Sequence, residues 1–223
     1  MVIWKSVVMR FVFRSFAVFL TLTFIPVSAN ALVFTNEAAF QTAAGGVVIE
    51  DFESYSLFDP VAALSGLHLS FSLPDSNSST VPQAYDQSSG GVSRSGQITL
   101  MNNDKLNLPA LGRMQIDADV GTEFLAFGYW NVGGDDVTRL TLYDVNDVVI
   151  ETAVTSEDDP AFIGIIGAVG ATRAVIEAVQ GNGWFTIDDI QVDSASVAAA
   201  IPAPGAMMLF LLGLAYMRSR RSR

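Results

Sequence analysis

The stretch Gly66-Leu-His-Leu-Ser-Phe-Ser-Leu73 alternates apolar and polar residues along its whole length. Four apolar residues occupy every second position, and His68 and two serines stand between them. Successive side chains of an extended chain point to opposite faces, so the stretch presents one apolar and one polar face. It therefore predicts a β-strand with one side in a hydrophobic core and the other in solvent.

The same period of two recurs along the chain in about ten short segments, with turn signals every 8–12 residues. The predicted strands are 47–55, 66–73, 96–101, 113–120, 123–131, 137–144, 147–154, 160–167, 172–179 and 183–192. Many short strands of this spacing are typical of an antiparallel sandwich or barrel. We predict an all-β fold, an antiparallel, jelly-roll-like β-sandwich.

Two other segments have a different pattern. The sequence from Leu32 to Gly46 predicts a short strand and then a short helix, which Thr35 or Asn36 caps at its start and Gly45-Gly46 ends. Residues 72–96 are rich in Ser, Gly, Asn and Pro, which indicates a long surface loop.

The N-terminal end has the layout of a secretory signal peptide. Residues 1–31 combine a basic start, an apolar run and the small-residue site Ala29-Asn30-Ala31. We expect cleavage after Ala31 and therefore an exported protein. The alternative is an uncleaved N-terminal anchor.

The C-terminal end is also apolar. Residues 202–223 begin with Pro202-Ala203-Pro204, continue as an apolar segment and end in four arginines. A helix from Gly205 to Met217 would rise about 20 Å, short of the ~30 Å hydrocarbon core, so this transmembrane helix is a weak permanent anchor. We expect the β-sandwich domain at 32–194, a flexible linker at 195–201 and this tail at 202–223.

The predicted domain is strongly acidic. All 23 acidic residues lie between Glu37 and Asp193, but only five basic residues do, which gives a net formal charge of −18. Such a domain repels nucleic acid and attracts cations. The chain has no cysteine, which excludes disulfides and thiol catalysis. His68 is the single histidine, and no serine-hydrolase elbow, zinc-protease helix or P-loop is present. We predict no catalytic activity.

Two acidic motifs stand at opposite ends of the domain. Asp51 and Glu53 belong to the segment IEDFES, and Asp188 and Asp189 belong to FTIDDIQV. The first and last strands of a sandwich are often neighbours, and oxygen ligands gathered from both would suit Ca²⁺. Neighbouring residues of a strand alternate, so only one of the two adjacent aspartates is expected to point inward. The sequence thus predicts a structural calcium site at these four residues. The alternative is exposed acids at strand ends.

Two further functions stay open. Tyr129, Trp130 and Trp184 could form a platform for sugar rings, although core packing is the commoner place for such residues. Paired carboxylates are numerous, so a secreted glycoside hydrolase is a less favoured alternative.

The C-terminal tail resembles the PEP-CTERM sorting signal of exported bacterial proteins. The resemblance rests on the Pro-x-Pro motif, the short apolar helix with Gly213 and the arginine cluster. Ala203 stands where the family usually has Glu. The resemblance implies a membrane transpeptidase of the exosortase type as partner, and delivery to the cell envelope or extracellular matrix.

The domain itself has a weaker resemblance to MAM-type jelly rolls, in DFE near the start and IDDI near the end. That resemblance implies structural calcium at Asp51, Glu53 and Asp188 or Asp189, although the MAM cysteines are missing. Together these features predict an exported structural or adhesive protein, with a carbohydrate-binding module for exopolysaccharide as the alternative.

Overall fold

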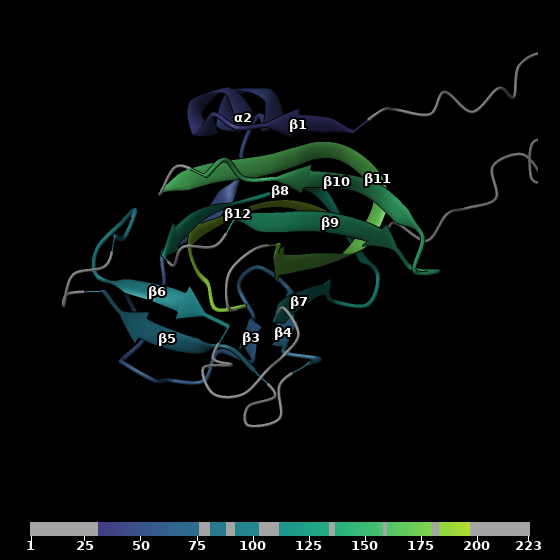
Figure 1. Ribbon diagram of the computed structural model, residues 1–223. Helices are drawn as coiled ribbons and strands as arrows, with labels where there is room; N and C mark the ends of the chain where they lie inside the picture. Colours follow the sequence, from purple (N-terminus) through teal and green to yellow (C-terminus); the bar gives the residue numbers. More distant parts are fainter. Residues whose placement is uncertain are drawn as a thin grey trace, which may run out of the picture. The chain divides into compact units, whose positions relative to one another are not determined.

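The computed structural model describes residues 31–75, 81–87, 92–102, 112–133, 137–157, 160–179 and 183–196 (Figure 1). Most of the predicted signal peptide, with Ala29, and the tail with Pro202, Ala203 and Pro204 lie outside these residues, so their roles stay predictions. Within the described part of the chain, no helix is long and apolar enough to cross a membrane.

The described residues form twelve strands and one short helix. The elements are β1 (Leu32–Phe34), α2 (Glu37–Ala44), β2 (Val48–Glu50), β3 (Ala63–Leu64), β4 (Leu69–Ser72), β5 (Gln83–Asp86), β6 (Ile98–Met101), β7 (Arg113–Ala118), β8 (Thr122–Gly133), β9 (Thr138–Asp144), β10 (Val149–Val154), β11 (Ala161–Ala178) and β12 (Thr186–Ser196). Every pairing among them is antiparallel. The all-β prediction is confirmed.

The long strand β11 belongs to both halves of a curled sheet (Figure 1). Its first half pairs with β1 and β8, and its second half pairs with β7 and β9. Between them stand Gly167 at φ 79° and Gly170 at φ 84°, values that glycine adopts without the steric cost of a Cβ. The sequence predicted two separate strands here, because glycines usually mark turns. In the structure they bend one continuous strand.

This bend defines two sheets that face each other. Sheet I contains β1, the first half of β11, β8 and β12, with β2, β6 and β5 beyond β12. Sheet II contains β3, β4, β7, the second half of β11, β9 and β10.

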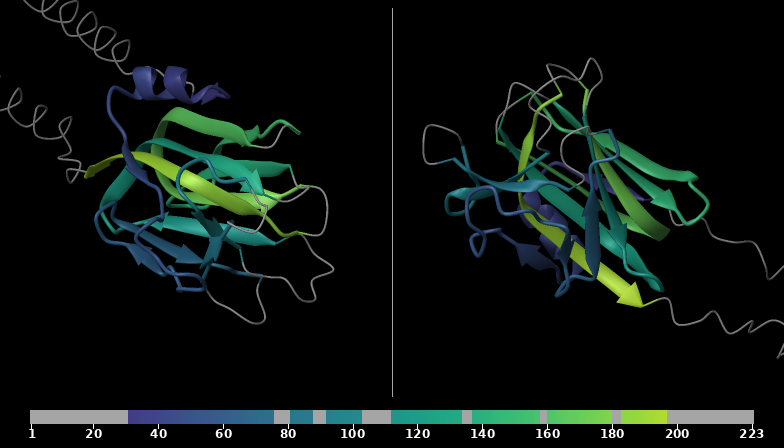
Figure 2. Two further views of the ribbon diagram at one scale, coloured as in Figure 1. Left: turned by 90° about the vertical axis from the view of Figure 1, so that its left-hand side faces the viewer. Right: turned by 90° about the horizontal axis from the view of Figure 1, so that it is seen from below.

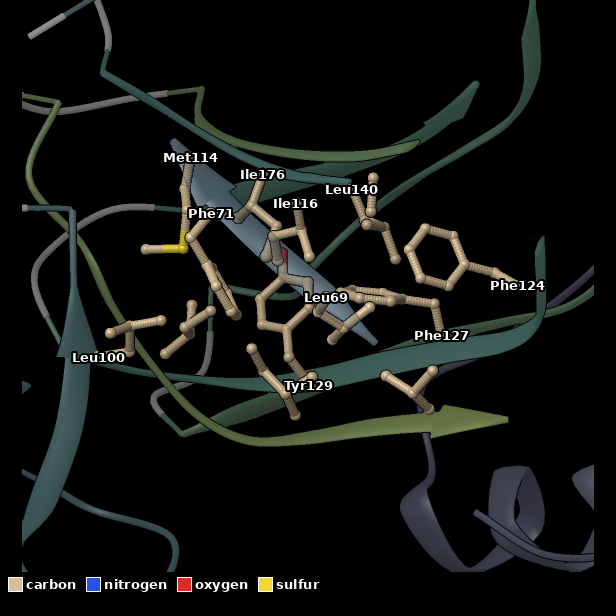
Figure 3. Close-up of a cluster of buried hydrophobic side chains, with 14 of the residues drawn as sticks. Leu69, Phe71, Leu100, Met114, Ile116, Phe124, Phe127, Tyr129, Leu140 and Ile176 are labelled. Atoms are coloured by element: carbon tan, nitrogen blue, oxygen red, sulfur yellow. The ribbon is translucent and has the colours of Figure 1, made fainter. Parts of the chain in front are cut away.

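The hydrophobic core lies between the sheets (Figure 3). Leu69 and Phe71 of β4 meet Phe127 and Tyr129 of β8 and Leu140 of β9, and all five are 4% exposed or less. Full burial of such a side chain contributes about 1.5–3 kcal/mol each to folding. The alternation in residues 66–73 therefore reported the core face correctly.

The structure corrects three sequence-based predictions of strand detail. His68 does not lie in a strand: it has φ 56° in the turn before β4, and its Nδ1 is 3.2 Å from Asp119 Oδ2. Alternation along the predicted strand 123–131 places Phe124 and Phe127 on opposite faces. Both pack in the core, because a register shift at Asp193/Ser194 breaks the alternation of β8. The predicted loop at 72–96 contains β5, which pairs with β6.

An outer layer covers part of sheet I (Figure 2). Asn36 caps α2 by accepting a hydrogen bond from Ala39 N at 2.9 Å, and Gly45 ends it at φ 77°. Phe40 of α2 is fully buried above the cross-strand pair Gly128–Gly164. A Cβ on Gly164 would lie 2.5 Å from the Phe40 ring, so this contact requires glycine. The predicted helix and both caps are confirmed.

Candidate functional site

The two acidic motifs meet in the structure. β2 ends at Glu50, and this residue pairs with Ile190 of β12, so Asp51 and Glu53 follow directly beside Asp188 and Asp189. The predicted juxtaposition of the motifs is thus confirmed. The sequence signal for it was only the general tendency of first and last strands to be neighbours.

Both aspartates of β12 are buried, and both side chains bond to the same loop. Asp188 is 0% and Asp189 8% exposed. Strict alternation fails because the β12–β8 register shifts between Asp188 and Gln191, and Asp189 has φ 46°. On its other side β12 pairs with β6 only at residues 186–187 and with β2 only at 190–192. The two aspartates lie in the gap between these partners.

Residues 93–97, here called the Arg94 loop, bond to the acids in this gap. Asp188 Oδ2 accepts hydrogen bonds from the backbone N–H groups of Arg94 at 2.8 Å and Ser95 at 3.0 Å. The Ser95 hydroxyl donates to Asp189 Oδ1 at 2.6 Å. Both adjacent aspartates therefore hold the same short segment.

Glu53 holds the other end of the Arg94 loop. Its Oε1 accepts the backbone N–H groups of Gln97 at 2.7 Å and Ile98 at 2.6 Å. Gly96 packs against the same carboxylate, and a Cβ there would lie 2.0 Å from Glu53 Cδ. Asp51 Oδ1 accepts Glu53 N at 3.2 Å.

Arg94 itself bonds to the outer layer. Its guanidinium lies 3.0 Å from Glu37 Oε2 and stacks 5.0 Å from the centre of the Trp130 ring. Glu37 Oε1 accepts hydrogen bonds from Gln191 and Gln41. Sequence reasoning missed Glu37 and Arg94. Glu37 lies in the first turn of α2, and nothing in the predicted helix or in the Ser- and Gly-rich segment indicated that Glu37 and Arg94 would pair.

We call this group of residues the acid site: Glu37, Asp51, Glu53, Asp188 and Asp189 with Arg94. Burial raises the pKa of Asp188 to about 6, and the neighbouring charge of Asp189 acts in the same direction. The hydrogen bonds that Asp188 accepts from three backbone N–H groups oppose this shift. Burial also raises the pKa of Asp189, and the nearby Glu37 and Asp51 act in the same direction. One arginine against five carboxylates leaves the site with a formal charge of −4.

A calcium ion would need carboxylate oxygens of the acid site that are not already used in hydrogen bonds. Among the described residues, no three acidic or histidine side chains gather closely enough to form a ready metal site. Both oxygens of Asp188 already accept N–H groups. Within the same part of the chain, Oδ2 of Asp51, Oε2 of Glu53 and Oδ2 of Asp189 accept no hydrogen bond. These three oxygens are the free hard ligands of the site.

The three predicted sugar-binding aromatics have different environments. Tyr129 is fully buried in the core, and its hydroxyl is 2.8 Å from Thr138 Oγ1. Trp130 lies between Phe162 and the Arg94 guanidinium, so it offers no open platform. Trp184 is half-buried and meets the Tyr85 ring edge-on at 6.1 Å. The structure does not bring the three together on one surface.

Comparison with known proteins gives little more. No protein-family profile matches the chain, and no curated protein matches it. Among solved structures, the K2 cleaved adhesin domain of Lys-gingipain aligns with a TM-score of 0.46 and 12% identity, over 66% of this chain and 99% of that one.

Proposed function

We propose that the chain is an exported, non-catalytic β-sandwich protein of the cell envelope or extracellular matrix, with a structural or adhesive role. The observation that supports this proposal is the way the acid site uses its carboxylates. Asp188, Asp189 and Glu53 accept hydrogen bonds from the Arg94 loop, and Glu37 pairs with Arg94. Each of these contacts joins a carboxylate to a neighbouring segment, and such contacts stabilise the fold.

We further propose that the tail delivers the protein. A signal peptidase cuts after Ala31, and an exosortase-type transpeptidase recognises Pro202-Ala203-Pro204 and cuts near it. The test is the intact mass of the protein recovered from the envelope and from the medium of its own host. A C-terminus between Pro202 and Gly205 supports sorting. A chain that still ends at Arg223 contradicts it and leaves a short inner-membrane anchor.

The acid site supports a proposal of structural calcium. The site has a formal charge of −4, so its carboxylates repel one another, and Asp51, Glu53 and Asp189 each have a free carboxylate oxygen. Calcium bound only by the folded state raises the melting temperature, because such a ligand draws the equilibrium toward folding.

We expect the exported protein to melt at a higher temperature in millimolar calcium than in chelator. The Asp189→Asn variant should lose this difference, whereas Asp193→Asn, a half-buried residue of the same strand, should keep it. Equal melting of the wild type in calcium and chelator contradicts the proposal.

A carbohydrate-binding module is the second candidate. Its support is a set of exposed or half-buried polar side chains on strands of sheet II: Ser70 of β4, Gln115 of β7 and Thr152 of β10.

A further inference from the structure

Three connections of the sandwich lie together at one of its ends: the β7–β8 turn (residues 119–121), the β9–β10 hairpin (145–148) and the bend of β11 (167–170). The first half of β11 pairs with β8 and its second half pairs with β7, so the β7–β8 turn lies beside the bend. The second half of β11 also pairs with β9, and Arg173 of β11 forms an ion pair with Asp147 of the hairpin at 2.6 Å. The three connections therefore share one end of the sandwich.

Each of these connections exposes a valine. Val120, Val145 and Val169 are the three most exposed large hydrophobic side chains of the described residues, at 106%, 78% and 67%. Val148 and Val149 beside Val145 are also exposed. The tips of turns usually carry Gly, Asn, Asp or Ser, so neither turn geometry nor packing accounts for these valines. Exposed apolar residues that gather in this way mark an interaction site, and we call this end of the sandwich the valine end.

The chain leaves the described domain at the valine end. β12 ends at Ser196, which pairs with Thr122, the first residue after the β7–β8 turn. The proposed cut lies between Pro202 and Gly205, so at most nine residues separate it from Ser196. Nine fully extended residues span about 32 Å. The enzyme that makes this cut therefore has its catalytic centre no farther than that from the end of β12, and so it works beside the valine end.

The valine end is also acidic. The acids within three positions of its three connections are Asp117, Asp119, Glu123, Asp144, Asp147 and Glu151. Arg173 is the one lysine or arginine in the same ranges. One arginine against six acids gives a formal charge of −5, so this end attracts partners that carry basic groups.

This combination of exposed valines and acids decides between three occupants. A second copy of the chain would bring two acidic ends together, and like charges repel. Surfaces that bind a lipid bilayer use basic residues and large apolar or aromatic side chains, whereas here the exposed apolar residues are valines and Arg173 is paired with Asp147. A protein with an apolar contact surface bordered by basic groups fits both the valines and the acids.

We propose that the valine end is the surface on which the membrane transpeptidase docks while it cuts the tail. The contact surface of that enzyme is apolar and bordered by basic residues. Docking holds the tail near the catalytic centre and so raises its local concentration there. β-Branched side chains suit such a contact, because they are stiff and lose little conformational entropy when it forms. This inference rests on the proposed sorting, and it names the surface that the sorting enzyme contacts beyond the tail.

The test follows removal of the tail from the full chain in its own host. The test variant combines Val120→Ser, Val145→Ser and Val169→Ser. The control variant makes the same change at three exposed valines outside the valine end, Val48→Ser, Val92→Ser and Val154→Ser. Melting curves establish that both variants are folded. Intact mass at intervals after induction gives the fraction of chains that end between Pro202 and Gly205.

The test variant should lose its tail about tenfold more slowly than the wild type, because a few central side chains carry most of the binding energy of an interface. The control variant should be processed at the wild-type rate. Equal rates in all three proteins, or equal slowing of both variants, overturn the inference alone. A wild type that keeps its tail contradicts the proposed sorting as well, so the two failures are distinguishable.

A spacer separates docking from recognition of the tail itself. About 20 Gly and Ser residues inserted after Ala199 should slow processing of the wild type about fivefold, because the effective concentration of a tethered segment falls with the −3/2 power of linker length. The same insert should have little effect in the test variant, which no longer docks. Equal slowing of both proteins by the insert contradicts docking.

Two further measurements on the processed protein test the other occupants. Flotation with vesicles of phosphatidylethanolamine and phosphatidylglycerol measures binding to a bilayer, and sedimentation measures self-association. We expect neither vesicle binding nor dimers. Vesicle binding or dimers that the wild type shows and the test variant lacks overturn the assigned partner in favour of the bilayer or of a second copy.

Discussion

Asp188 accepts backbone N–H groups from Arg94, Ser95 and Asp189, although its side chain is withdrawn from solvent. A buried carboxylate is costly unless hydrogen bonds compensate for its lost hydration. Here the compensation comes from a segment almost a hundred residues away in the sequence. The Asp188 side chain therefore connects β12 to the Arg94 loop and holds both segments in place.

We expect Asp188→Ala to lower the free energy of unfolding by about 3 kcal/mol, because it leaves buried N–H donors without an acceptor. Asp188→Asn, which keeps one acceptor oxygen, should cost less. Denaturant unfolding measures both. Asp193→Ala on the same strand is the control and should change the free energy of unfolding by less than about 0.5 kcal/mol. Equal effects at the two positions would contradict the structural role of Asp188.

At the level of elements, the junction of α2 with sheet I depends on shape. Phe40 fills the space above Gly128 and Gly164, in a small cluster separate from the main core. The helix is only eight residues long, too short to be stable alone, so this contact and the capping by Asn36 keep it in place.

This contact predicts a strong coupling between Phe40 and Gly164. Phe40→Ala should cost about 3 kcal/mol through the cavity it creates, and Gly164→Ala should also destabilise because its Cβ would clash with the ring. The double variant should be more stable than the sum of the two losses predicts, since the methyl group then enters vacated space. A double-mutant cycle from denaturant unfolding measures the coupling. Strict additivity would show that the ring and the glycine do not meet.

The elements also show what the sequence could predict. Strands such as β7 and β9 and the helix with its Asn36 cap follow from local periodicity and capping chemistry. Local patterns contain no information on the bend in β11 or the register shifts in β8 and β12, because long-range pairing decides them. The two acidic motifs with Asp51, Glu53, Asp188 and Asp189 could be identified locally. The Arg94–Glu37 pair could not, because the two residues lie 57 positions apart in sequence.

At the scale of the whole molecule, the excess of acid governs the response to pH. Asp188, Asp189 and Glu50 have pKa values raised mainly by burial, so the folded state binds more protons than the unfolded state at mildly acidic pH. Their contribution to stability is present at low pH and is lost as pH rises through about 6 for Asp188. Asp75 and Asp144 have lowered pKa values and act in the opposite direction, but only at more acidic pH.

We therefore expect the melting temperature, measured in chelator, to rise as the pH falls from 7.5 to about 5. General repulsion within an acidic domain would give the same trend, but salt screens it. The rise in melting temperature should persist in about 0.5 M salt, because the Debye length is then only a few ångströms. The Asp188→Asn variant should show a smaller rise in melting temperature over the same pH range. A melting temperature that falls steadily from pH 7.5 to 5 would contradict these assignments.

The position of β12 also bears on mechanical load. The last described strand runs beside β8 from Thr186 to Ser196 and is flanked on its other side by β6 and β2. In a protein tethered through its C-terminus, a pulling force acts along the axis of β12. The backbone hydrogen bonds between β12 and β8 then resist the force together, in shear, and do not break one after another. Sheet I as a whole would then resist unfolding when fluid flow pulls on a tethered cell. The acid site lies partway along the same strand, where it fastens β12 to the Arg94 loop.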